Sequence, residues 1–239
     1  MNTFTLKPVL VITLLTLLSI SNSHSANAPW VGNNLSNAPC LGKSQGYGPF
    51  DYLLKSRYQR ELILVEGSHF VPKVENLIGG NRGQLIQDLD YTLRAWPNHH
   101  RALNSISKYV LLFPNKKKPV SLVECYFQRA INFSPKDSTT KMLYGMYLHK
   151  RKHTKTALKY YEQAVELSPS NPIIRYNYGL LLVDLKKYPL AQKQAAKAYE
   201  ANFPLYGLKN KLKKAGYWPP KSIPKNKLNQ ALPKKPTVQ

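Results

Sequence analysis

Six carboxylate and imidazole side chains in the first half of the chain are of the types used in acid–base catalysis and divalent metal binding. Asp88 and Asp90 are two positions apart and would point to different sides of a helix, and the adjacent histidines at 99 and 100 would also diverge. No spacing forces the six into one site. We therefore expect Asn98 and the histidines at 99 and 100 to cap a helix, and Glu66 and His69 to anchor the N-terminal cap by hydrogen bonds. The six residues are Glu66, His69, Asp88, Asp90, His99 and His100.

Two glycine-containing stretches resemble parts of nucleotide-binding loops without meeting their requirements. Gly42-Lys43-Ser44 looks like the end of a phosphate-binding loop, but that loop needs a glycine where this chain has Asn37. The stretch from Gly79 to Gly83 reads as a turn, because no strand-then-helix pattern surrounds it. We predict no catalytic residues, no cofactor and no metal ligands. An enzyme or metal site near Glu66, His69 and His99 is the alternative.

The composition is that of an ordinary folded protein with an unusual charge. The 239 residues are 43% hydrophobic and 20% charged, which excludes a mainly disordered chain and a polytopic membrane protein. Two cysteines are too few for a disulfide-rich scaffold or a four-cysteine zinc site. Thirty-five basic residues against 12 acidic ones give a net charge of +23.

That charge is unevenly distributed along the chain. The net charge is +1 over residues 38–100, +12 over 101–203 and +9 over 204–239. A field of this strength attracts anions, so anionic lipid surfaces, wall polymers and acidic proteins are candidate partners. A solvated surface that binds nothing in particular is the alternative. We expect no nucleic-acid partner, because the chain carries an export signal.

The first residues read as that signal. Val9 to Ile20 is an apolar run of twelve residues, too short to cross a bilayer core of about 30 Å as a helix. Lys7 precedes it and a small polar stretch follows, which is typical of a secretory signal peptide cleaved after Ser25. An uncleaved anchor is the alternative. We expect a periplasmic or secreted protein, in which Cys40 and Cys125 either pair or remain two buried thiols.

A 34-residue period organises the middle of the chain. Gly145 and Gly179 are 34 apart, and so are several alanines and the prolines at 135 and 169. Such a period predicts pairs of antiparallel helices, with small residues where the helices approach most closely and a proline after the second helix. The alanines are Ala130, Ala164 and Ala198 in one series and Ala157 and Ala191 in another.

This pattern resembles the tetratricopeptide repeat. Three segments further resemble uncharacterised exported bacterial proteins built from such repeats, namely Gly46–Tyr52, Val65–Phe70 and Asp88–Leu103, and the likeness covers roughly residues 38–218. It implies an all-α solenoid of helical hairpins and no particular reaction. We predict a signal peptide (1–25), an irregular N-terminal cap (26–83), repeats (84–203), a capping helix (204–218) and a disordered basic tail (219–239). The first predicted repeat is degenerate, with its second helix at Leu85–Trp96. Three blocks follow, at about 98–137, 138–171 and 172–203, and the first of them contains a basic insertion at 114–119.

The resemblance also implies a groove, because the first helices of such repeats line the concave side of the stack. Met142 and Met146 stand where the family's carboxylate-binding grooves need polar groups, so a mixed apolar and basic groove for a protein or peptide is the expectation. The predicted function is a non-catalytic adaptor. A protein that binds polyanions or an anionic membrane surface through its basic repeats and tail is the alternative, and the oligomeric state is left open. The predicted groove residues are Arg101, Asn104, Lys108, Met142, Met146, His149, Lys150, Tyr176, Asn177 and Leu180.

Overall fold

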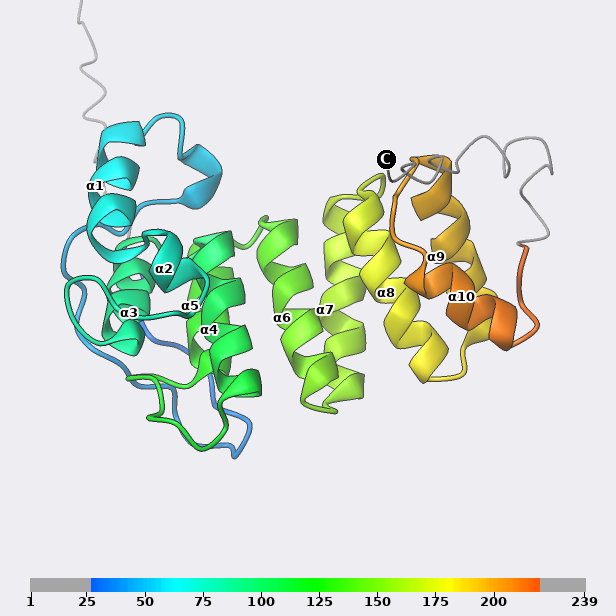
Figure 1. The fold of residues 1–239 in the computed structure, drawn as a ribbon, viewed down its shortest axis with the longest axis horizontal. Coiled ribbons are helices and arrows are strands. Elements are labelled where there is room, and N and C mark those ends of the chain that lie inside the picture. Colours follow the sequence, from blue (N-terminus) through cyan, green and yellow to red (C-terminus); the bar gives the residue numbers. More distant parts are fainter. Residues whose placement is uncertain (1–26, 220–239) are drawn as a thin grey trace, which may run out of the picture.

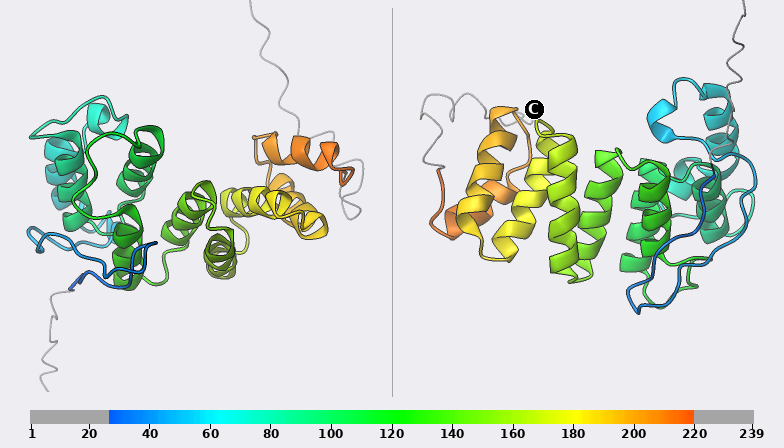
Figure 2. Two further views of the ribbon diagram at one scale, coloured as in Figure 1. Left: turned by 90° about the horizontal axis from the view of Figure 1, so that it is seen from below. Right: turned by 180° about the vertical axis from the view of Figure 1, so that it is seen from behind.

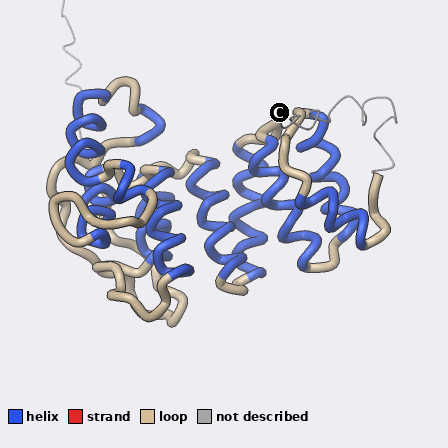
Figure 3. The backbone as a smooth tube through the Cα atoms, viewed as in Figure 1, coloured by secondary structure: helices blue, strands red, loops and turns tan. Residues whose placement is uncertain are grey.

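The computed structural model describes residues 27–219, and the regular secondary structure of this part of the chain is all helical (Figures 1 and 3). The predicted signal peptide at 1–25 and nearly all of the predicted tail lie outside these residues. Within 27–219, no helix combines the length and apolar character needed to span a bilayer. The elements are η1 (Tyr52–Leu54), α1 (Gln59–His69), α2 (Pro72–Glu75), α3 (Leu85–Ala95), α4 (His100–Leu112), α5 (Val123–Phe133), α6 (Ser138–Lys150), α7 (Thr154–Leu167), α8 (Pro172–Asp184), α9 (Tyr188–Glu200) and α10 (Gly207–Lys214).

Successive helices are neighbours in space, as in a helical repeat (Figures 1 and 2). The closest partners are α6 with α7 and α8 with α9, the hairpins of the two clearest sequence blocks. Between hairpins, α4 packs on α6, and α6 packs on α8. The helices therefore form an elongated row that follows the chain from α1 to α10.

The turns within the two clearest hairpins have the same geometry. Lys152 and Lys186, which are 34 residues apart, both adopt a left-handed backbone, with φ of 65° and 58°. In each turn the next amide donates to a carbonyl five residues earlier, over 2.9 Å and 2.8 Å. This pattern closes a helix by satisfying its last carbonyl groups. The sequence period is thus reproduced in the backbone.

Small side chains lie where helices cross. All five alanines of the 34-residue series are fully buried. A Cβ added to Gly145 would lie 3.1 Å from the ring of Tyr161 on the facing helix α7. Closely packed interiors leave no room for extra atoms at such crossings, which explains why glycine and alanine recur there.

The N-terminal region is more regular than the sequence indicates. The helix α3 lies where the sequence predicts the second helix of the degenerate repeat, whereas α1 lies in the region predicted to be irregular. On α1, Val65 is buried against Trp96, but Ile63 and Leu64 are exposed. Apolar side chains on both faces hide the helical period, which depends on one apolar and one polar face. α1 packs on α3.

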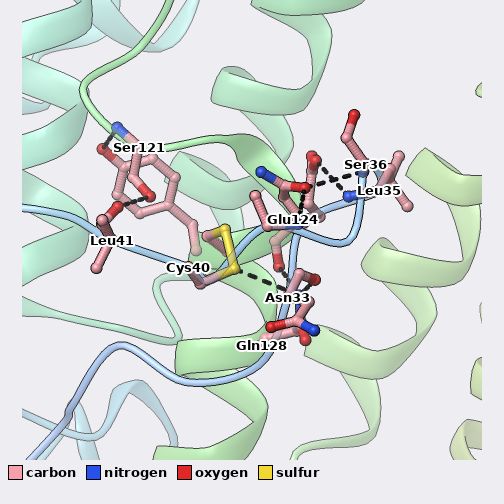
Figure 4. The surroundings of a disulfide bond; sticks show 12 residues. Asn33, Leu35, Ser36, Cys40, Leu41, Ser121, Glu124 and Gln128 are labelled. Carbon is pink, nitrogen blue, oxygen red and sulfur yellow. Dashed lines mark hydrogen bonds between the residues drawn. A yellow bond between two sulfur atoms is a disulfide. The ribbon is translucent and has the colours of Figure 1, made fainter.

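Residues 27–50 form an extended strap that runs along the outside of α5 (Figure 2). A disulfide between Cys40 and Cys125 joins the strap to the first turn of α5 (Figure 4). The carboxylate of Glu124 accepts from the amide of Leu35 at 3.0 Å, and Gln128 donates to the carbonyl of Asn33 at 2.7 Å. The paired state of the cysteines, one of the two alternatives from the sequence, is the one observed.

The guanidinium of Arg129 is the buried centre of this attachment. The residue is 2% exposed and donates to the carbonyls of Ala28 at 2.6 Å and Leu93 at 2.7 Å. It also bonds to the side chain of Gln45 and stacks over the ring of Trp30. Carbonyl oxygens and an aromatic face therefore satisfy this charge, and burial lowers the pKa of Arg129 to about 10.

Removing the disulfide should destabilise the protein without changing its fold. The bond closes a loop with a sequence separation of 85 residues. Chain entropy for a loop of that length corresponds to about 4–5 kcal/mol, and measured losses for native disulfides are about 2–5 kcal/mol. We expect Cys40→Ser/Cys125→Ser to lower the free energy of urea unfolding by about that amount. A reducing agent should have the same effect on the wild type and none on the variant, and a loss below about 1 kcal/mol would contradict the prediction.

Candidate binding groove

A cavity of about 290 Å³ lies along the helices α4, α6 and α8 and is closed at one side by α10. We call it the α4–α6–α8 groove. Each of these three helices begins the hairpin of a predicted repeat, so the cavity collects equivalent positions from successive hairpins. Its lining is Asn104, Ser107, Lys108, Leu111, Leu143, Met146, Tyr147, His149, Lys150, Tyr161, Asn177, Leu180, Asp184 and Lys211.

Seven of the ten residues predicted for the groove line this cavity, and three do not. Met142 is only 6% exposed and belongs to the core. Tyr176 is buried against Phe203 in the segment that folds back after α9, with ring centroids 4.7 Å apart. Arg101 lies beyond the end of the cavity, where Glu75 and Glu66 hold its guanidinium. These three residues therefore do not line the cavity, and the contacts of Arg101 and Tyr176 come from segments distant in sequence.

The other residues that line the groove were not predicted from the sequence. Two of them, Asp184 and Lys211, add a charged network to one side of the groove. Asp184 accepts from His149 Nε2 at 2.9 Å and from Lys211 Nζ at 2.7 Å. Burial lowers the pKa of His149 below its usual 6.5, against the opposing effect of Asp184. Asp184 ends α8 and Lys211 lies on α10, so the repeat pattern alone contains no signal for this network. The contact with Lys211 depends on the placement of α10 against α8, whereas the contact with His149 joins α6 to α8.

Two lysines of the groove have no partner within residues 27–219. Lys108 and Lys150 are exposed and make no hydrogen bond or ion pair there, while Asn177 uses its amide N–H on its own helix. Between them lie the half-buried apolar side chains of Leu143, Met146 and Leu180. The groove thus offers apolar surface flanked by positive charge. Such a surface is suited to a chain segment that carries an apolar side chain beside a carboxylate.

The six acidic and imidazole residues of the first half form separate pairs rather than one site. His69 pairs with Asp88, His99 with Glu66 and His100 with Asp137, each at 2.8 Å. Asp90 instead accepts from Tyr126 at 2.6 Å and from Arg94. Within residues 27–219, no three His, Cys, Asp or Glu side chains lie close enough together to hold a metal ion.

His99 caps α4, as the sequence predicts. Its Nδ1 accepts from the amide of Ala102 at 3.1 Å, so the ring proton sits on Nε2 and is donated to Glu66. The ring is fully buried, and burial lowers the pKa of His99 below its usual 6.5. The hydrogen bond from His99 in turn holds the pKa of Glu66 below its usual 4.5. The neutral imidazole satisfies both of its neighbours at once, and Glu66 anchors α1 as expected.

Asn98 has a different role from the predicted helix cap. Its side chain accepts from the amide of Tyr52 and donates to Asp51 at 2.7 Å and to Asp137 at 3.0 Å. Asp137 caps α6 by accepting from the amide of Thr140. Asn98 therefore connects three segments at the junction of η1, α4 and α6.

In comparisons with known proteins, no family model matches the chain and no curated protein sequence matches it.

The free energy of unfolding should decrease as the pH is lowered, because His99 becomes protonated. Because its folded pKa lies below the unfolded value of about 6.5, its contribution is present above that pH and is lost below it. Protonation would also place an N–H on Nδ1. This N–H would face the backbone N–H of Ala102, from which Nδ1 accepts a hydrogen bond in the neutral form. We expect the free energy of unfolding to fall between pH 7.5 and 5.5, and His99→Asn, which keeps a capping acceptor, to reduce that slope.

The matched control is His153→Asn, since His153 is exposed and makes no side-chain hydrogen bond within the described residues. Urea unfolding at pH 7.5, 6.5 and 5.5 measures the slope for all three proteins. Equal slopes in the wild type and His99→Asn would contradict the role assigned to His99.

Proposed function

We propose that the protein is an exported, non-catalytic adaptor of the tetratricopeptide type, which binds a segment of a partner protein in the α4–α6–α8 groove. The 34-residue period, the paired helices and the matching turns support a tetratricopeptide assignment for α4 to α9. In the same proposal, α10 is the C-terminal cap of the stack. Its Leu208 and Leu212 are fully buried, while Lys213 and Lys214 are exposed.

The observation that carries this proposal is the contrast between used and unused polar groups. Around α1, α3 and α4, the acids and imidazoles bond to one another. In the groove, Lys108 and Lys150 have no partner within the described residues, although they flank the apolar side chains of Met146 and Leu180. Unused charges beside a half-buried apolar surface favour binding over structural support.

The same contrast is the reason for proposing a non-catalytic role. Glu66 and His99, two members of the alternative enzyme site, bond to each other, and His99 is fully buried. His69 pairs instead with Asp88 on α3. These three side chains serve two separate attachments of α1.

A second candidate function is attachment to an anionic envelope surface. The lysines Lys193 and Lys197 on α9, and Lys213 and Lys214 on α10, are all exposed. In this alternative the charge provides the affinity, so binding should weaken steeply with salt. Groove binding, which includes apolar contacts, should be more tolerant of salt.

Peptide selection tests the proposal. Random peptides are selected on residues 26–239, and the affinities of the enriched ones are measured by fluorescence anisotropy. We expect enriched peptides to place an apolar side chain next to a carboxylate. The double variant Lys108→Glu/Lys150→Glu should lower the affinity for these peptides at least about tenfold, because each lysine forms a charge-assisted contact with the peptide.

The control is Lys155→Glu/Lys159→Glu on α7, which makes the same change in net charge at exposed lysines outside the cavity. Measurements at 0.1 M and 0.5 M salt separate the two functions. Equal weakening in both variants, together with loss of binding at high salt, would favour the anionic-surface alternative. Peptides that bind both variants as tightly as the wild type would contradict the groove proposal.

A further inference from the structure

A second cleft, of about 320 Å³, lies on the outer side of α3. It brings together three sequence features that are far apart in the chain. Lys43 comes from the Gly42-Lys43-Ser44 stretch, Arg82 from the glycine-rich turn, and His69 from the set of acidic and imidazole residues. Asp88, Asp90 and Arg94 of α3 complete the charged lining.

The two carboxylates of this cleft are already satisfied from within the protein. Asp88 is 2% exposed and accepts from His69 Nδ1 at 2.8 Å and from the amides of Asn81 at 2.5 Å and Arg82 at 3.2 Å. Asp90 is 1% exposed and accepts from Tyr126 and Arg94. Both carboxylates are almost completely buried and already bonded to donors of the protein, which argues against a metal ligand.

The cationic groups are not satisfied in the same way. The side chains of Lys43 and Arg82 are exposed and make no hydrogen bond or ion pair within residues 27–219. Arg94 uses Nε on Asp90 and Nη1 on the carbonyl of Ser44 at 3.1 Å, and its Nη2 has no partner there. The cleft therefore presents unused donors on three positive side chains.

His69 is held in a fixed orientation at this cleft. Because Asp88 accepts from two backbone amides as well, it acts as a carboxylate acceptor, and His69 Nδ1 carries the proton that it receives. The ring stacks on Tyr91 with centroids 3.9 Å apart. Nε2 has no partner within the described residues. It can accept a hydrogen bond from a hydroxyl of a bound ligand.

We propose that this cleft binds a phosphoryl group, either as inorganic phosphate or as the phosphomonoester of a small molecule. Guanidinium groups match the oxygens of a phosphate in pairs, and lysine adds a point charge. Three cationic side chains with free donors suit a dianion better than a singly charged carboxylate. The site is separate from the α4–α6–α8 groove and does not depend on the adaptor function.

Isothermal titration calorimetry of residues 26–239 tests the proposal, with inorganic phosphate and glycerol 3-phosphate as probes and sodium chloride at matched ionic strength as the blank. We expect saturable binding of one phosphoryl group per chain. Arg82→Ala and Lys43→Ala should each weaken it by about tenfold, the usual effect of losing a charge-assisted hydrogen bond. Both side chains are exposed, so neither variant should impair folding.

Lys73→Ala on α2 is the matched control, because Lys73 is exposed, carries the same charge and lies outside the cleft. Tighter binding of glycerol 3-phosphate would assign the cleft to a phosphomonoester, and tighter binding of phosphate would assign it to the free ion. Absence of saturable binding for both probes would overturn the proposal. So would equal weakening in Lys73→Ala and Arg82→Ala, since that would reflect net charge alone.

Discussion

A helix in a row of hairpins can bury its apolar face only against its neighbours, so the stability of such a row depends on how its two ends are covered. At the C-terminal end, α10 places Leu208 over Gly179 of α8. At the other end, the strap lies over α5 with Arg129 buried beneath it. A fully buried guanidinium is tolerated only because backbone carbonyls surround it, which makes the path of the strap specific.

The sequence predicts the elements whose burial follows a simple period. The helices α3 to α9, the basic loop before α5 and the helix at 207–214 all lie where the pattern places them. It fails at α1, where Ile63 and Leu64 are apolar but exposed. The pattern also fails at Tyr176, which was predicted to line the groove. Its side chain is buried against Phe203, in the segment that folds back over α8. Periodicity encodes contacts between neighbours in a hairpin. The failure at α1 comes from apolar residues on both faces of the helix, and the failure at Tyr176 comes from a segment that folds back from further along the chain.

Polar side chains divide the molecule into two parts with different character. Near α1 to α4, Asn98, His99 and Asp137 are buried and completely paired, so each fixes the relative position of two or three segments. Buried networks of this kind stabilise one arrangement and tolerate little change. Along the α4–α6–α8 groove, Lys108 and Lys150 stay solvated beside apolar surface. The N-terminal part is thus built for rigidity, and the groove retains polar groups for other molecules.

The bond from Arg129 to Ala28 spans 101 positions, and the Cys40–Cys125 bond spans 85. By contrast, the hairpins α6–α7 and α8–α9 are completed by residues close together in sequence. Contacts of high sequence separation form slowly, because a long loop must close before they contribute. The strap is synthesised before every helix, but its bonds to Cys125 and Arg129 cannot form until α5 has emerged. The first residues of the fold, around Ala28, therefore obtain their buried contacts only after about a hundred further residues have been added.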